Sequence, residues 1–211
     1  MLFALVVLLF AILSHPAHPA SRWAWAGTAA VAAAQTAVRS SSRTVAPSRT
    51  TADDVVAVGA PDRRHQAIAD YLSRRFQVAA GPTAEVVEGA HRVGAQIGVD
   101  PLLILAVVAV ESRFHPYAES SAGAKGLMQI IPKYHLEKLE ALGGEEAVLD
   151  PDVNLRVGAA ILQEYLRRAG NVRDALQMYN GSLGDETRAY ATKVLREKNR
   201  LNQMVAAQAQ A

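Results

Sequence analysis

The residue with the clearest chemical potential is Glu111, which directly follows the apolar run Leu102 to Val110. If that run forms a buried helix, the carboxyl group lies where an apolar element ends, beside a loop of small residues, SSAGAKG. Apolar surroundings and the negative end of a helix dipole both disfavour a charged carboxylate, so we expect a raised pKa for Glu111. A carboxyl group that keeps its proton near neutral pH suits a general acid for a glycosidic oxygen. The alternative is an exposed glutamate paired with Arg113 or Lys125.

Other catalytic chemistries find little support in the residue types. The chain has no cysteine, which excludes disulfides, thiolate nucleophiles and zinc–thiolate sites. No nucleophile-elbow motif surrounds Ser112 and His115. The formal net charge is +2 and the basic residues are scattered, so nucleic acid is not an expected partner. Neither a metal nor a cofactor is expected: His15 and His18 lie in the N-terminal region interpreted below as a signal segment, and the other histidines show no ligand spacing, namely His65, His91, His115 and His135.

Several short motifs follow one another from Glu111 to Val194. They are Glu111-Ser112 with Ser120, Gly126-Leu127-Met128-Gln129 with Pro132, Asn154 with Gly158, Met178-Tyr179-Asn180-Gly181, and Tyr190 with Lys193-Val194. In this order they resemble the soluble lytic transglycosylase family, whose catalytic domain has a goose-type, lysozyme-like fold. The resemblance covers residues 84–201. The sequence departs from the family pattern at two places that concern the shape of the groove. Met178 replaces the usual alanine, and Lys133-Tyr134-His135 replaces the more common Ala-Thr.

The resemblance implies an enzyme that cleaves peptidoglycan glycan strands with Glu111 as its single acid/base. Glu111 would protonate the bond between N-acetylmuramic acid (MurNAc) and N-acetylglucosamine (GlcNAc). It would then deprotonate the MurNAc 6-hydroxyl, which attacks its own anomeric carbon and leaves a 1,6-anhydro end.

Roles for further residues follow from the same resemblance. Ser120 would hydrogen-bond near the acid or the acetamido group, and Tyr179 would orient the glutamate. The implied substrate-binding residues are Gln129, Met128, Ile131, Asn180 and Tyr190. Each also has a structural interpretation: Ser120 as a turn residue, for example, and Met128 or Tyr179 as core. Taken singly, we favour the structural role for Met128 and Tyr190, and the functional one for Ser120, Gln129 and Tyr179.

Two other functions compete with this hypothesis. A hydrolytic, lysozyme-like muramidase would need a second carboxylate to activate water. Asp150 is better explained as a helix N-cap and Asp152 as a first-turn partner of the helix dipole, which leaves Glu119 as the open candidate. The second competitor is a wall-binding or secretion-apparatus component that keeps the groove but does not catalyse the reaction. The sequence argues against it, because it retains the motif residues Glu111, Ser120 and Gln129.

The elements that must position these residues are predicted to be all helical. Apolar residues at a helical period indicate helices over Ile68–Phe76 and Val86–Ile97, separated by Gly81-Pro82. Asp100-Pro101 supplies an N-cap and a first-turn proline for the apolar run, which favours a helix over the alternative of a buried strand. Later helices are predicted from near 135 to 143, and from Asp150, Asn171 and Asp185 onward. We expect one all-α, lysozyme-like domain over 61–203 and a disordered tail over 204–211.

The N-terminal part of the chain is predicted to direct export. Leu2 to Leu13 is uniformly apolar and would span about 18 Å as a helix, against a hydrocarbon core of about 30 Å. This length fits a signal peptide, so residues 1–34 are interpreted as a signal peptide or, alternatively, as a membrane anchor through residues 2–13. Residues 35–60, rich in Ser, Thr, Arg and Pro, are predicted to be a flexible linker. The expected location is the periplasm or cell envelope, with glycan strands as partner and secretion machinery as a further candidate.

Overall fold

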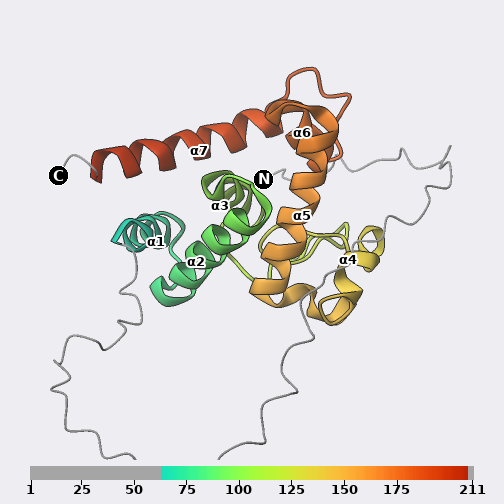
Figure 1. Ribbon diagram of the computed structural model, residues 1–211, viewed down its shortest axis with the longest axis horizontal. Coiled ribbons are helices and arrows are strands. Elements are labelled where there is room, and N and C mark those ends of the chain that lie inside the picture. The colour runs from blue at the N-terminus through green and yellow to red at the C-terminus, as the bar shows by residue number, and fades with distance from the viewer. Residues whose placement is uncertain (1–62, 209–211) are drawn as a thin grey trace, which may run out of the picture. The chain divides into compact units, whose positions relative to one another are not determined.

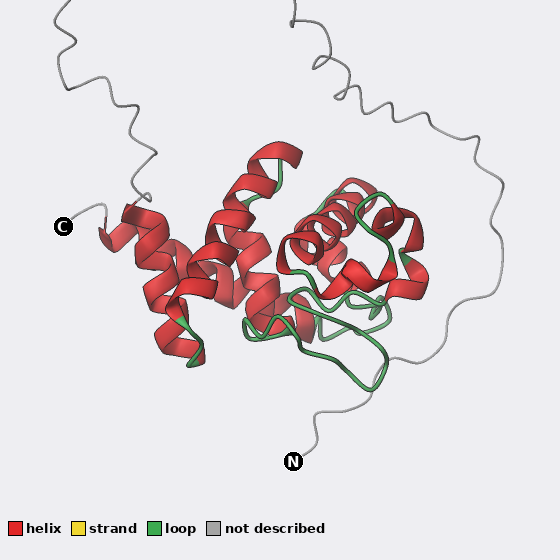
Figure 2. Cartoon of the chain, turned by 90° about the horizontal axis from the view of Figure 1, so that it is seen from below, coloured by secondary structure: helices red, strands yellow, loops and turns green. Residues whose placement is uncertain are grey.

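The computed structural model describes residues 63–208, so the predicted signal or anchor segment and the linker lie outside the described residues. The main helices are α1 (Arg63–Phe76), α2 (Ala80–Ile97), α3 (Pro101–Glu111), α5 (Pro151–Ala169), α6 (Val172–Tyr179) and α7 (Ala189–Gln208). Between α3 and α5 lie α4 (Leu136–Glu140) and two 3-10 turns, η1 (Pro132–Tyr134) and η2 (Glu145–Leu149). Figure 2 shows these helices joined by loops. Over 63–208 the only extended pairings are two isolated β-bridges. The prediction of an all-α, lysozyme-like domain is confirmed.

Three of the main helices begin at the predicted capping residues. Asp100 accepts a hydrogen bond from the N–H of Leu102 at 2.8 Å, and Asp150 accepts from the N–H of Asp152 at 2.9 Å. Asn171 accepts from the N–H of Asp174 in the same way. These side chains satisfy backbone donors that have no partner within the helix, and so they fix where each helix starts.

Helix α3 forms the centre of the core. It packs against α2 on one side and α7 on the other, while α5 packs against α2 and α6 (Figure 1). Residues Leu103 to Ala109 are all buried, which explains why the apolar run has no polar face. A second, smaller hydrophobic cluster is formed where α4, η2 and α5 meet, and it includes Leu139, Val148 and Ile161. The polar residue that ends α3 is therefore held by the most deeply buried helix.

Four element boundaries differ from the prediction. The last helix, α7, begins at Ala189 and not directly after Asp185, whose side chain accepts from the N–H groups of Thr187 and Ala189 in the turn that precedes the helix. Gly81-Pro82 lies inside the first turn of α2. A backbone N–H has no acceptor within the helix at such a position, so proline, which has no N–H, is tolerated there. Helix α4 ends at Glu140, before the two glycines. Helix α7 continues to Gln208, so the prediction of a disordered tail from 204 is wrong for the described residues. Met204 and Val205 pack against the core and hold this end of the helix in place.

In residues 63–208, no helix combines the length and the apolar character that crossing a bilayer would require.

Candidate active site

Glu111 is the last residue of α3, and the chain turns sharply after it. Arg113 and Phe114 both adopt left-handed backbone conformations, with φ of 54° and 67°, which are unfavourable for residues with a side chain. The turn is stabilised by burial of Phe114, whose ring lies 5.5 Å from that of Phe76. The Ser112 hydroxyl donates to the carbonyl of Val108. The sharp turn leaves the Glu111 side chain at the edge of the core.

The proton affinity of Glu111 reflects two opposing contacts. Burial raises the pKa of its carboxyl group, and a hydrogen bond from Tyr190 partly lowers that pKa by stabilising the charged form; the net result is a pKa of about 7. The Tyr190 hydroxyl donates to Oε1 of Glu111 at 2.6 Å. Within the described part of the chain, no ion pair joins Glu111 to Arg113 or Lys125, so the alternative of an exposed, ion-paired glutamate is not what the structure shows. At neutral pH this carboxyl group can both give and take a proton.

The structure exchanges the roles expected of two tyrosines. The hydrogen bond to Glu111 comes from Tyr190, for which a structural role alone was favoured, and not from Tyr179. The Tyr179 hydroxyl donates instead to the carbonyl of Met128 at 2.9 Å, and its ring stands edge-on to Tyr165. Tyr190 reaches the carboxylate because α7 packs along α3. Burial, together with the nearby Glu111, raises the pKa of both tyrosines well above the usual value, so both act as neutral donors.

The loop after Glu111 is held by its own polar groups. Gln129 has a left-handed backbone, with φ of 50°, and its side-chain amide donates to the carbonyls of Ala118 and Gly126, each at 3.0 Å. Ser120 is exposed, and its hydroxyl oxygen accepts from the N–H of Ala124 at 3.1 Å, as in its interpretation as a turn residue. Both side chains therefore shape the loop in this structure.

Met128 is completely buried and is not among the residues that line the cleft described below, as in the structural role favoured for it over the implied substrate-binding one. It packs against Gly158 of α5, where an added Cβ would lie 2.5 Å from the Met128 sulfur. The N–H of Met128 donates to the side chain of Asn154 at 2.8 Å. Asn154 is itself buried and donates to the carbonyls of Lys125 and Val148. One asparagine thus joins α5 to the loop, a function that its motif position alone did not reveal.

An open cleft of about 720 Å³ runs past the carboxyl group. Its lining comprises Val110, Glu111, Ser112, Arg113, His115, Pro116, Tyr117, Ala118, Glu119 and Gln129. Sequence reasoning missed His115 and Tyr117 as lining residues; their only signal is their position directly after Glu111. Three residues that the resemblance placed at the site do not line this cleft: Ser120, Ile131 and Asn180. The side-chain amide of Asn180 donates to the hydroxyl of Ser182.

The residue types in the cleft suit proton transfer at a polar, extended ligand. Glu111 can exchange a proton at neutral pH, and Gln129, Arg113 and Tyr117 add an amide, a cation and a ring that is 74% exposed. Across residues 63–208, no group of three or more His, Cys, Asp or Glu side chains could hold a metal ion.

Comparison with known proteins gives concordant matches. The family described as Transglycosylase SLT domain matches residues 90–202. The transglycosylase of Enterobacteria phage PRD1 is 39% identical over 112 residues, which cover 51% of this chain and 40% of the phage protein. Membrane-bound lytic murein transglycosylase C of Klebsiella pneumoniae is 31% identical over 121 residues, covering 51% of this chain and 34% of that protein. The chain therefore spans well under two thirds of the length of these relatives.

Solved structures agree in fold. An inactive mutant of the lytic transglycosylase Slt from Pseudomonas aeruginosa has a TM-score of 0.51 and 26% identity, over 57% of this chain and 24% of that chain. The 70-kDa soluble lytic transglycosylase from Escherichia coli has a TM-score of 0.51 and 25% identity, over 64% of this chain and 26% of that chain.

Proposed function

Because the chain belongs to the Transglycosylase SLT domain family, we propose that it is a lytic transglycosylase that cleaves peptidoglycan glycan strands. The observation that carries this proposal is the state of Glu111: a carboxyl group with a pKa of about 7, at the end of a buried helix and in an open cleft. Both matched relatives carry transglycosylase names, and one is named a lytic murein transglycosylase.

The proposed reaction uses one carboxylate twice. Protonated Glu111 donates to the oxygen between MurNAc and GlcNAc as the bond from that oxygen to the MurNAc anomeric carbon breaks, assisted by the substrate's acetamido group. The resulting carboxylate takes the proton of the MurNAc 6-hydroxyl, whose oxygen bonds to the anomeric carbon and closes the 1,6-anhydro ring. The proton returns to Glu111 and water is not consumed. The hydrogen bond from Tyr190 supports the charged form that exists between the two steps.

The test is digestion of purified sacculi by the full chain, followed by mass spectrometry of the products. We expect fragments that end in 1,6-anhydroMurNAc. Glu111→Gln keeps the shape of the side chain but removes its proton exchange, and it should lower activity by at least about 100-fold. The matched control is Glu140→Gln, which neutralises an exposed carboxylate on α4 and should leave activity unchanged. Full activity in the Glu111→Gln variant would overturn the assignment.

A hydrolytic muramidase is the second candidate, because Glu119 lines the same cleft as Glu111. In a hydrolase, Glu119 would activate water and the products would carry reducing MurNAc ends. Glu119→Gln should then abolish cleavage. In the proposed lytic reaction, which uses no second carboxylate, the same variant keeps forming anhydro ends.

We further propose that the protein is exported to the periplasm or cell envelope, where its substrate would be. The proposal is supported by the apolar run Leu2–Leu13 and by the name of the membrane-bound relative. Attachment through residues 2–13 and a partnership with envelope or secretion machinery are further parts of it. Cell fractionation with N-terminal sequencing of the mature protein distinguishes a cleaved signal from a retained anchor.

A further inference from the structure

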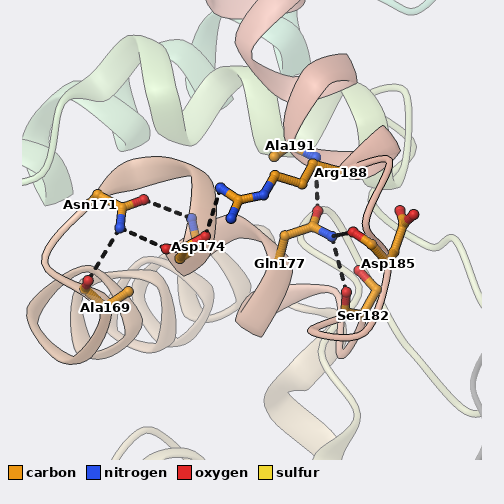
Figure 3. A network of polar contacts seen from close by, with 8 residues as sticks. All are labelled: Ala169, Asn171, Asp174, Gln177, Ser182, Asp185, Arg188 and Ala191. Carbon is orange, nitrogen blue, oxygen red and sulfur yellow. Dashed lines mark hydrogen bonds and ion pairs between the residues drawn. The ribbon is translucent and has the colours of Figure 1, made fainter.

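The position of Tyr190 depends on how α7 begins. Tyr190 lies in the first turn of α7, and residues 180–188 connect that turn to the end of α6. The hydroxyl must lie at 2.6 Å from Glu111, so a small shift in the start of α7 would break the contact. The polar groups that fix this connection are drawn together in Figure 3.

Gln177 of α6 contributes the buried polar side chain of this network, with 3% of its surface exposed. Its side-chain oxygen accepts from the N–H of Ala191 at 3.3 Å, and its nitrogen donates to the carbonyls of Ser182 at 3.0 Å and Asp185 at 3.4 Å (Figure 3). The first N–H groups of a helix have no acceptor within the helix. Ala191 is completely buried, so water cannot serve its N–H. Gln177 supplies that acceptor from a different helix.

The other polar side chains of the network lie nearer to solvent. Asp185 accepts from the N–H groups of Thr187 and Ala189, and Arg188 forms an ion pair with Asp174 at 2.8 Å. Arg188 has a φ of 50°, which turns the chain abruptly into α7. Water can replace exposed contacts of this kind at little cost. The buried amide of Gln177 has no such substitute, and it contacts the chain on both sides of Tyr190.

We propose that Gln177 is a positioning residue, which joins the 180–188 connection to the first turn of α7 and thereby holds the Tyr190 hydroxyl against Glu111. The catalytic consequence rests on the proposed function, whereas the positioning itself does not. A side chain with both an acceptor and a donor is required here, because the carbonyls and the N–H must be satisfied at one place.

The test is to titrate Glu111 in the full chain by NMR of its carboxyl carbon, in Gln177→Met, in Tyr190→Phe and in the double variant. Gln177→Met keeps the bulk of the side chain and removes its three hydrogen bonds. We expect it to raise the pKa of Glu111, because the carboxylate loses the hydroxyl that stabilises it. Tyr190→Phe should raise the pKa as well, and Gln177→Met should add no further shift in that background. Ser182→Ala is the matched control, since it leaves the Ser182 carbonyl in place for Gln177.

The proposal would be overturned if Gln177→Met left the pKa of Glu111 unchanged. It would also be overturned if Gln177→Met shifted this pKa by the same amount in the Tyr190→Phe background as in the original chain. A purely structural role would lower the melting temperature without moving this pKa in the folded protein. If the methionine variant does not fold, Gln177→Asn retains an amide with a shorter reach and should shift the pKa in the same direction. The titration needs no turnover, so it remains decisive even if the proposed reaction is wrong.

Discussion

Glu111 and Tyr190 set between them the pKa that a single acid/base group requires. Burial alone would hold the carboxyl group protonated and make it a poor base, while the tyrosine hydroxyl stabilises the carboxylate and returns the pKa to about 7. A group that must donate and then recover a proton works best when its pKa lies near the pH of the reaction. In the proposed reaction, the pair is therefore balanced for both steps.

Replacing Tyr190 by phenylalanine should shift this balance toward the protonated form. The pKa of Glu111 rises, so the acid remains protonated to higher pH and the upper limb of the pH profile of kcat/KM moves to higher pH. The rate at the optimum should fall, because the carboxylate is less stable between the two steps. Activity measured between pH 5 and 9 checks this expectation.

Tyr179→Phe is the control for that variant. It removes a hydroxyl that bonds to the carbonyl of Met128, and it should cost about 1 kcal/mol of stability while leaving the upper limb in place. A limb that moves in Tyr179→Phe and stays in Tyr190→Phe would contradict the assignment of the two hydroxyls.

The sequence was sufficient to predict Glu111 but not the tyrosine that contacts it. An apolar run that ends in a carboxylate is a local pattern, and its consequence for the pKa follows from burial alone. Tyr179 and Tyr190 both stand in motifs on neighbouring helices. Which hydroxyl reaches Glu111 depends on how α7 packs along α3, and that information is absent from any local window of residues.

At the scale of elements, the loop that carries Gln129 depends on its contact with α5. Gly158 allows Met128 to approach the helix, since a Cβ at this position would lie 2.5 Å from the sulfur and 2.7 Å from Cβ of Met128. Because Met128 is fully enclosed, its side chain has little room to move away. The position of the cleft wall is thus determined by a helix that does not itself line the cleft.

Gly158→Ala should destabilise the protein by about 1–3 kcal/mol, because it overpacks the core where α5 meets the loop. It should also lower activity through displacement of the residues beside Met128. The matched control is Gly81→Ala in α2, where an added Cβ meets nothing within 4 Å. That substitution should be neutral or stabilise the helix by up to about 1 kcal/mol. Equal effects of the two variants in urea unfolding would contradict the close-contact explanation.

The elements themselves were largely predictable because their ends carry strong local signals. Asp100, Asp150 and Asn171 cap helices as the sequence indicates. The extent of α7 was not predictable, because the residues after Leu201 have no apolar period of their own and are held by tertiary packing of Met204 and Val205. The left-handed turn at Arg113 and Phe114 was also missed, since neither residue type favours it.

For the molecule as a whole, the proposed acid lies at the end of the helix that forms the centre of the core. Helix α3 is enclosed by α2 and α7, so the surroundings that raise the pKa of Glu111 are the same contacts that stabilise the fold. A site built in this way places a cost on the folded state whenever the carboxyl group is charged. Global stability should therefore report on the site.

That cost can be measured as a dependence of stability on pH. The pKa of Glu111 rises from 4.5 to about 7 in the folded protein, so the folded state binds more protons than the unfolded state between these values. The resulting stabilisation of the folded state, relative to a chain whose Glu111 is charged, is fully present below pH 4.5 and is lost as the pH rises through 7. A shift of this size corresponds to about 3 kcal/mol, a large part of a typical unfolding free energy of about 5–15 kcal/mol.

Glu111→Gln should abolish this dependence, because glutamine resembles the protonated acid at every pH. We expect the variant to match the original chain near pH 4 and to be more stable by up to about 3 kcal/mol at pH 8. Urea unfolding of both chains at the two pH values measures the difference, with Glu140→Gln as a control for loss of an exposed charge. Because the same substitution should remove glycan cleavage, it would gain stability as it loses activity, as expected when a fold retains an unfavourable group for its chemistry. A stability difference that does not change between pH 4 and pH 8 would show that the raised pKa is not a property of the folded chain.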